Sequence, residues 1–258
     1  MVRKLLKHEL FALFRILVWF MGAVLLLGVL ARIADALMPS DIQNTYGAGA
    51  FFAMSLVIVM HNSAVLALCF AAVLLSLVRF FRSLFTGEGY LTFSLPATPT
   101  QLLIAKFLGA FIATAACLVT AFVSELIAMP ISDWALFQLL PDLFALMGAY
   151  FSSEPLVAVE IVLLIIALIP SELLYLYLVA SIGQLFTKGR IPITIALYYG
   201  ISFALSFFFT IFFLPMIELA FVSVHLVMWL LIAIVAGFDV GSFFFIRFIL
   251  TRKVNLVV

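Results

Sequence analysis

A few side chains that could do chemistry stand inside long apolar stretches of this sequence. Glu172 and Asp239 each lie near the middle of such a stretch, and the pair His61-Asn62 interrupts a third. Carboxyl and imidazole groups in these surroundings are costly unless they line an ion or substrate path, carry protons, or hydrogen-bond a neighbouring helix. We therefore name these four residues as a possible substrate pathway. For Glu172 the functional and structural interpretations are balanced, while helix–helix hydrogen bonding or packing is the default for the other three.

The motifs of several enzyme classes are absent from the sequence. A P-loop needs a glycine directly before its lysine, but the residues before the five lysines are Arg3, Leu6, Ala105, Thr187 and Arg252. His8-Glu9 begins like a zinc-protease helix, yet Ala12 replaces the second histidine, and no G-x-S-x-G elbow occurs. We expect no enzymatic activity, cofactor or metal site on this chain.

The composition indicates a membrane protein. Of 258 residues, 67% are hydrophobic and only 10% are charged, and the mean hydropathy is +1.37. Soluble domains are about 25% charged, and a soluble fold of this size could not bury so much apolar surface. The net charge of +1 gives no reason to expect nucleic-acid binding.

Six apolar stretches are long enough to cross a bilayer as helices, which needs roughly 20 residues each. They cover residues 13–33, 51–78, 102–128, 156–186, 193–213 and 221–250. We therefore predict an all-α polytopic membrane protein with a single transmembrane domain. Residues 2–14 have basic and apolar faces, which predicts an N-terminal interfacial helix, the alternative being a plain extension of the first span. Pro215, Glu218 and His225 interrupt the run after residue 209, which raises the possibility of a re-entrant segment between helices five and six.

The basic residues predict the orientation. Twelve of the 13 lysines and arginines flank the two ends of the chain and the loops after spans two and four, whereas Arg32 alone falls on the other side. By the positive-inside rule, both termini and these two loops are cytoplasmic. Glu125 and Glu160 then lie near the outer ends of their spans, where we expect them to be solvated.

The longest predicted cytoplasmic connection covers residues 79–101. Helix two is expected to continue beyond the membrane through Val78–Phe85. Thr98-Pro99-Thr100-Gln101 fits a capping box with proline at the first helical position, so helix three should begin at Pro99. The aromatic residues in this segment are too apolar for a loop that only faces water, and they predict contact with lipid or a protein partner.

These residues carry a family resemblance. The run RFFRSLFTGEGYLTFSLPATPTQLLIAK, residues 79–106, resembles the cytoplasmic signature of bacterial ABC-2 type transporter permeases. The opening VRKLLKHEL and the ending LTRKVNL are similar to the two ends of the same group.

The resemblance implies a permease subunit of an ATP-driven exporter in the bacterial cytoplasmic membrane. Such subunits pair with a second permease chain, identical or related, and with separate ATP-binding cassette subunits that hold ATP and Mg. The segment between helices two and three would dock on the ATPase, which implies coupling roles for Phe81, Phe85, Gly87, Glu88, Gly89, Tyr90, Leu91, Thr98 and Pro99. Two alternatives stay open: a secondary transporter that uses intramembrane carboxylates, and a non-transporting assembly subunit.

Overall fold

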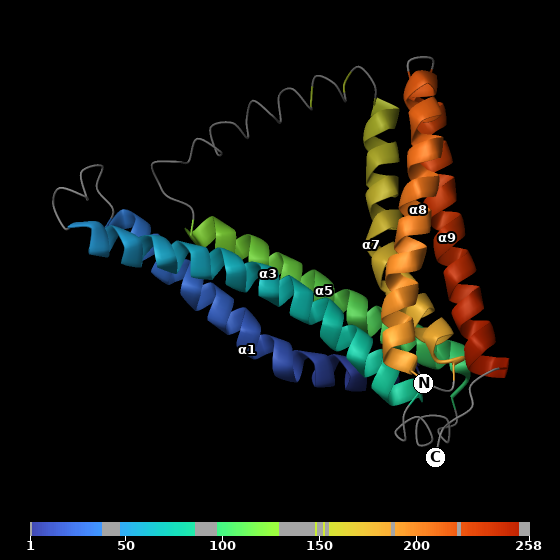
Figure 1. The fold of residues 1–258 in the computed structure, drawn as a ribbon, viewed down its shortest axis with the longest axis horizontal. Coiled ribbons are helices and arrows are strands. Elements are labelled where there is room, and N and C mark those ends of the chain that lie inside the picture. The colour runs from blue at the N-terminus through green and yellow to red at the C-terminus, as the bar shows by residue number, and fades with distance from the viewer. Residues whose placement is uncertain are drawn as a thin grey trace. The chain divides into compact units, whose positions relative to one another are not determined.

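The computed structural model describes residues 2–37, 47–85, 97–128, 148, 152, 155–186, 189–220 and 223–252. These residues are almost entirely helical. The long helices are α1 (Val2–Ala36), α3 (Gly47–Phe85), α5 (Pro99–Ala128), α7 (Pro155–Gly183), α8 (Arg190–Ala220) and α9 (Val224–Arg252), traced in Figure 1. All six are long and apolar enough to cross a membrane, so the prediction of an all-α polytopic membrane protein is confirmed.

Two helix boundaries follow the capping signals in the sequence. The Thr98 N–H donates to Gln101 Oε1 at 3.2 Å, and the Gln101 N–H donates to Thr98 Oγ1 at 3.3 Å. This reciprocal capping box starts α5 at Pro99, as predicted. Gly189 precedes α8 with a φ of 68°, which a residue with a Cβ rarely adopts, and its carbonyl accepts a hydrogen bond from the Ile193 N–H.

Two expectations at helix ends are corrected. The predicted entry helix at residues 2–14 is not separate, because α1 runs unbroken over 35 residues. The possible re-entrant segment after residue 209 is not found in the described residues 209–220, where α8 continues as one helix through Pro215 to Ala220. In lipid an unbroken helix satisfies its own backbone hydrogen bonds, so a proline or a few charges need not end it.

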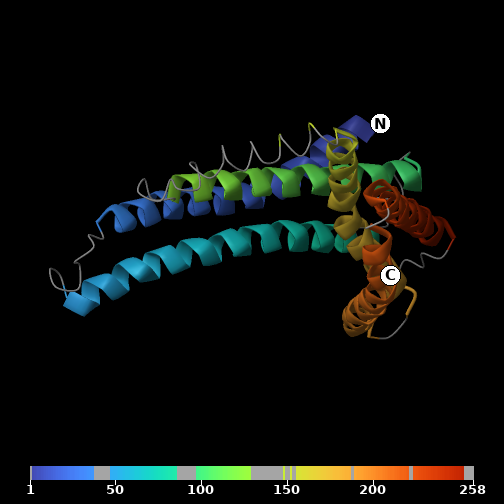
Figure 2. The same ribbon diagram turned by 90° about the horizontal axis from the view of Figure 1, so that it is seen from above.

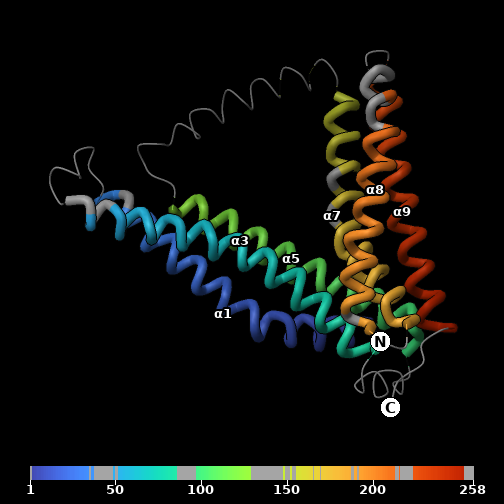
Figure 3. Tube along the Cα trace, in the orientation of Figure 1, coloured from blue at the N-terminus to red at the C-terminus, as the bar shows by residue number. Residues whose placement is uncertain are grey.

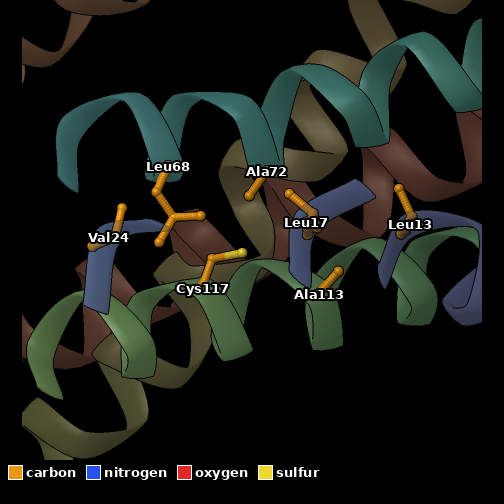
Figure 4. Packing of buried hydrophobic residues seen from close by; sticks show 7 residues of the cluster. All are labelled: Leu13, Leu17, Val24, Leu68, Ala72, Ala113 and Cys117. Carbon is orange, nitrogen blue, oxygen red and sulfur yellow. The ribbon is translucent and has the colours of Figure 1, made fainter. Parts of the chain in front are cut away.

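The described chain divides into two compact units. The first, here called the α1 unit, contains α1, α3 up to Ser76 and α5 from Leu108. These three helices lie side by side in both ribbon views (Figures 1 and 2). Their shared core is shown in Figure 4 and consists of Leu13, Leu17, Val24, Leu68, Ala72, Ala113 and Cys117. The small residues among them let the helix backbones approach closely.

The second unit, here called the α7–α9 unit, contains the end of α3 from Leu77, the start of α5 up to Phe107, and α7, α8 and α9. The three last helices are neighbours in the tube trace of Figure 3, and α7 packs along α9 more extensively than either packs on α8. No described residue in the Pro192–Phe212 part of α8 is buried. In a membrane, this helix therefore presents its phenylalanines to lipid or to another chain.

Candidate functional site

The predicted coupling residues divide into two groups. Five of them lie outside the residues that the structure describes: Gly87, Glu88, Gly89, Tyr90 and Leu91. The other four lie on the two helix ends that flank this segment: Phe81 and Phe85 on α3, and Thr98 and Pro99 at the start of α5. The flanks can therefore be described at atomic detail.

Aromatic rings anchor the end of α3. Phe80 stacks on Tyr177 of α7 with ring centroids 3.9 Å apart and an interplanar angle of 7°. Phe85 meets Phe80 edge-on at 5.9 Å, and Phe81 lies 6.1 Å from Phe85. The exposed fractions of Phe80 and Phe85 are only 1% and 6%. The expectation that these rings need lipid or a separate protein is therefore wrong for Phe80 and Phe85, since the chain's own α7–α9 unit covers them.

The start of α5 belongs to the same unit and is largely buried. The capping box fixes its first turn, and the next two turns are buried at Leu102, Leu103, Ala105 and Lys106. Lys106 is 5% exposed, an unusual degree of burial for a lysine. Both ends of the segment at residues 86–98 are thus fixed to packed helices, so a force on the segment would act on α3 and α5 directly.

His61, a candidate pathway residue, takes part in a buried hydrogen-bond chain in the α1 unit. Its Nε2 lies 2.8 Å from Ser124 Oγ, and the Ser124 hydroxyl donates to the Val24 carbonyl oxygen at 3.0 Å. A hydroxyl has one proton to donate, so the His61 Nε2–H must be the donor to Ser124 Oγ. The chain joins α3, α5 and α1, which agrees with the structural interpretation of His61. Its neighbour Asn62 is exposed.

Gly28 allows this hydrogen-bond chain to form. A Cβ at position 28 would lie 2.6 Å from Ser124 Oγ and 3.3 Å from His61 Nε2. Neither Gly28 nor Ser124 was predicted from the sequence to take part in a site. A small residue in α1 and a hydroxyl in α5 are common in apolar spans, and nothing local indicates which ones face each other.

The other candidate pathway residues, Glu172 and Asp239, lie in the α7–α9 unit. Glu172 is exposed on α7. Asp239 on α9 is partly buried, and its Oδ1 atom is buried without a hydrogen-bond partner among the described residues. No hydrogen bond joins these two carboxyl groups within the described part of the chain. Glu172 remains a candidate for a polar path, because an exposed carboxyl within a span needs water, a ligand or another protein surface. Asp239 remains one because of its buried Oδ1 atom.

A polar contact between α7 and α8 lies close to Glu172 in sequence. The Tyr175 hydroxyl donates to the Tyr198 carbonyl oxygen at 2.8 Å and lies 2.7 Å from Ser202 Oγ. Since the phenol has a single proton, Ser202 donates to the Tyr175 oxygen. These two hydrogen bonds connect α7 to α8, whose outer face is exposed.

Glu160 differs from its expected environment. We predicted a solvated carboxylate near an outer helix end, but Glu160 is 2% exposed, and both of its oxygens lie 3.0 Å from His225 Nδ1. The pair links α7 to α9, and the correction has a physical cause. Residue 160 lies just inside the start of α7 and residue 225 just inside the start of α9, so the two helices bring the groups to one level. Both residues lie in the first two turns of helices that follow a predicted outer loop, and this shared position was the signal in the sequence.

An apolar cavity of about 550 Å³ lies between α7, α8 and α9. Its walls include Leu168, Phe208, Phe212, Ile234 and Phe238, and its polar lining is limited to Ser171 and Ser206. The size falls in the range of small-molecule sites, which are about 300–1,000 Å³. Because its lining is almost entirely apolar, the cavity is suited to hydrocarbon groups.

Comparisons with protein-family models, with curated proteins and with solved structures give no match to this chain.

Proposed function

We propose that this chain is the permease subunit of an ATP-driven ABC exporter and that it works as a dimer, with itself or a related chain. Residues 79–101 would couple it to a separate ATPase subunit. The proposal starts from the resemblance of residues 79–106 to the ABC-2 signature and from the lack of a Walker motif. The orientation is the one that the basic residues predict, with both termini cytoplasmic.

The observation that carries the proposal is the anchoring of both flanks of the coupling segment in one unit. On one side, Phe80 stacks on Tyr177 of α7. On the other, the capped and buried start of α5 belongs to the same α7–α9 unit. A segment that docks on a moving ATPase must pass its movement to the spans, and a close-packed aromatic contact passes displacement better than a flexible linker.

The proposal is tested by purifying the tagged chain from its native host in mild detergent, identifying the co-purifying proteins and measuring ATP hydrolysis. The expected result is a stoichiometric ATP-binding cassette protein and ATPase activity. A matched sample with the coupling turn changed at Glu88→Ala and Tyr90→Ala should be folded but depleted of this partner. A chain that purifies alone, even after cross-linking in the membrane, would contradict the proposal.

A secondary transporter is the second candidate function, because Glu172 is exposed within a span and Asp239 Oδ1 is buried without a partner among the described residues. Carboxyl groups of this kind can couple ion and substrate movement. Transport driven by an ion gradient in vesicles that lack any ATPase would favour this candidate. Loss of that transport in Glu172→Gln would identify the carboxyl involved. The third alternative, a non-transporting assembly subunit, has no observation that favours it.

A further inference from the structure

The first turns of α1 carry basic and aromatic side chains on one exposed face. We call this face the α1 stripe, and it consists of Arg3, Lys4, Lys7, Phe11, Arg15 and Trp19. All six side chains are exposed, with Phe11 at 69% and Trp19 at 81%. Most of them recur every four residues, which places them in one row along a helix.

The opposite face of the same turns packs on the protein. Leu13 and Leu17 belong to the buried core of the α1 unit. Further toward the start of α1, the Glu9 and Leu6 side chains lie against Gly109 of α5, where an added Cβ would be 3.2 Å from Glu9 Cβ. Because one face is held by α5, the α1 stripe points away from the α1 unit.

The length of α1 determines which layer of the bilayer the α1 stripe contacts. A helix of 35 residues is roughly 50 Å long, whereas the hydrocarbon core of a bilayer is about 30 Å thick. Even a tilted α1 therefore extends into the headgroup layer. The predicted span begins at residue 13, so the cations at positions 3 to 7 lie among headgroups, while Arg15 reaches back to them and Trp19 faces acyl chains.

We propose that the α1 stripe is a binding surface for the headgroups of anionic phospholipids in the cytoplasmic leaflet. Four cations face a phosphate-rich layer, and arginine guanidinium groups pair with phosphate oxygens in a bidentate manner. The Lys7 ammonium lies 5.9 Å from the centroid of the Phe11 ring, which restrains its long side chain on the stripe. Phosphatidylglycerol or cardiolipin would thus be enriched next to α1. This inference does not rest on the proposed function.

Trp19 makes the proposal measurable, because it is a fluorophore on the stripe itself. The chain contains three tryptophans, and Trp134→Phe with Trp229→Phe leaves Trp19 as the only one. This single-tryptophan parent is reconstituted into two mirror mixtures of phosphatidylglycerol and phosphatidylcholine, with bromine on the acyl chains of one lipid or of the other. The quenching by brominated phosphatidylglycerol is divided by the quenching by brominated phosphatidylcholine, and then by the mole ratio of the two lipids. The resulting ratio reports the enrichment of the anionic lipid around Trp19, and a value of one means no enrichment.

The parent should give a ratio well above one, since each cation near the surface favours an anionic lipid about fivefold. The variant Arg3→Gln/Lys7→Gln/Arg15→Gln leaves Lys4 as the one cation on the stripe and should lower the ratio severalfold, while Arg3→Lys/Lys7→Arg/Arg15→Lys should keep the parent ratio. The control Arg247→Gln/Arg252→Gln removes two exposed cations from α9 and should leave the ratio unchanged.

A parent ratio of one would overturn the proposal. So would an enrichment that is undiminished in the triple glutamine variant, because the anionic lipid would then be bound elsewhere. Circular dichroism and gel filtration of each variant establish that it is folded. If the triple variant is unfolded, Lys7→Gln and Arg15→Gln are measured singly, and each should lower the ratio. High salt offers a second readout on the parent alone, because it should lower the ratio by screening.

Discussion

The rings of Phe80 and Tyr177 lie face to face, 3.9 Å apart and within 7° of parallel. Phe80 is on the part of α3 beyond the predicted membrane span, and Tyr177 is on α7. The contact therefore ties the flank of the predicted coupling segment to a helix that also carries Glu172. If the segment moves with an ATPase, this stack is a contact through which the movement would reach α7.

The stack should contribute measurably to stability. Phe80→Leu and Tyr177→Leu are each expected to destabilise the protein, and the double variant should be less destabilised than the sum of the two. The expected coupling energy is about 1 kcal/mol, typical of an aromatic pair. Thermal unfolding of the four proteins in one detergent measures it. Phe203→Leu, at an exposed position, should change the melting temperature little, and simple additivity of the two single changes would show that the stack adds nothing beyond burial.

Gly28 should be intolerant of even a methyl group. Gly28→Ala would place a Cβ 2.6 Å from Ser124 Oγ and disturb the hydrogen bond to His61, so we expect a loss of about 1–3 kcal/mol in stability. The matched control is Gly22→Ala on the same helix, where no heavy atom lies within 4 Å of the added Cβ. It should be neutral or slightly stabilising, because alanine favours helix. Equal melting temperatures for the two variants would contradict the close packing of α1 on α5.

The Glu160–His225 pair should be more sensitive to the loss of one partner than of both. His225→Ala leaves a buried carboxylate without its contact, and we expect a loss of about 1–2 kcal/mol, discounted because His225 is partly exposed. Glu160→Ala/His225→Ala should be less destabilised than the sum of the single changes. His8→Ala, at an exposed histidine, serves as the control. Strict additivity in unfolding measurements would mean that the two groups do not interact.

Glu172→Gln should separate a functional carboxyl from a structural one. The side chain is exposed, so the neutral amide should leave the melting temperature and the association with the proposed ATPase partner unchanged. If Glu172 lines a polar path, transport or the ATP hydrolysis coupled to it should fall. Both are measured on the purified complex in vesicles. Unchanged transport and hydrolysis would show that Glu172 has no role in transport, and a lower melting temperature would indicate a structural role.

The sequence predicted those features that depend on local composition. The spans follow from runs of apolar residues, the start of α5 from Thr98 and Gln101, and the extension of α3 through Phe85 from its helical pattern. Each of these signals acts within a few residues of its effect. For this reason the predicted and observed helix boundaries mostly agree within a few residues.

The contacts between helices could not be predicted in the same way. Whether Ser124 meets His61, or Glu160 meets His225, depends on how each helix is rotated about its axis, and uniformly apolar spans carry little information on rotation. The same limit applied to Phe80 and Phe85, which looked like a surface for a partner and are buried on their own chain. Pro215 misled in another way, since a proline can remain inside a helix within the membrane.

Residues 79–101 are proposed to dock on a separate ATPase, and site-specific photo-crosslinking in native membranes can detect that contact. A photoreactive phenylalanine analogue is placed at Tyr90, in the predicted coupling turn, and in a control protein at the exposed Trp229 of α9, which the predicted orientation places toward the other side of the membrane. We expect a covalent adduct with an ATP-binding cassette protein from position 90 and none from position 229. No such adduct from position 90, in membranes where the chain is folded and abundant, would contradict the proposed docking.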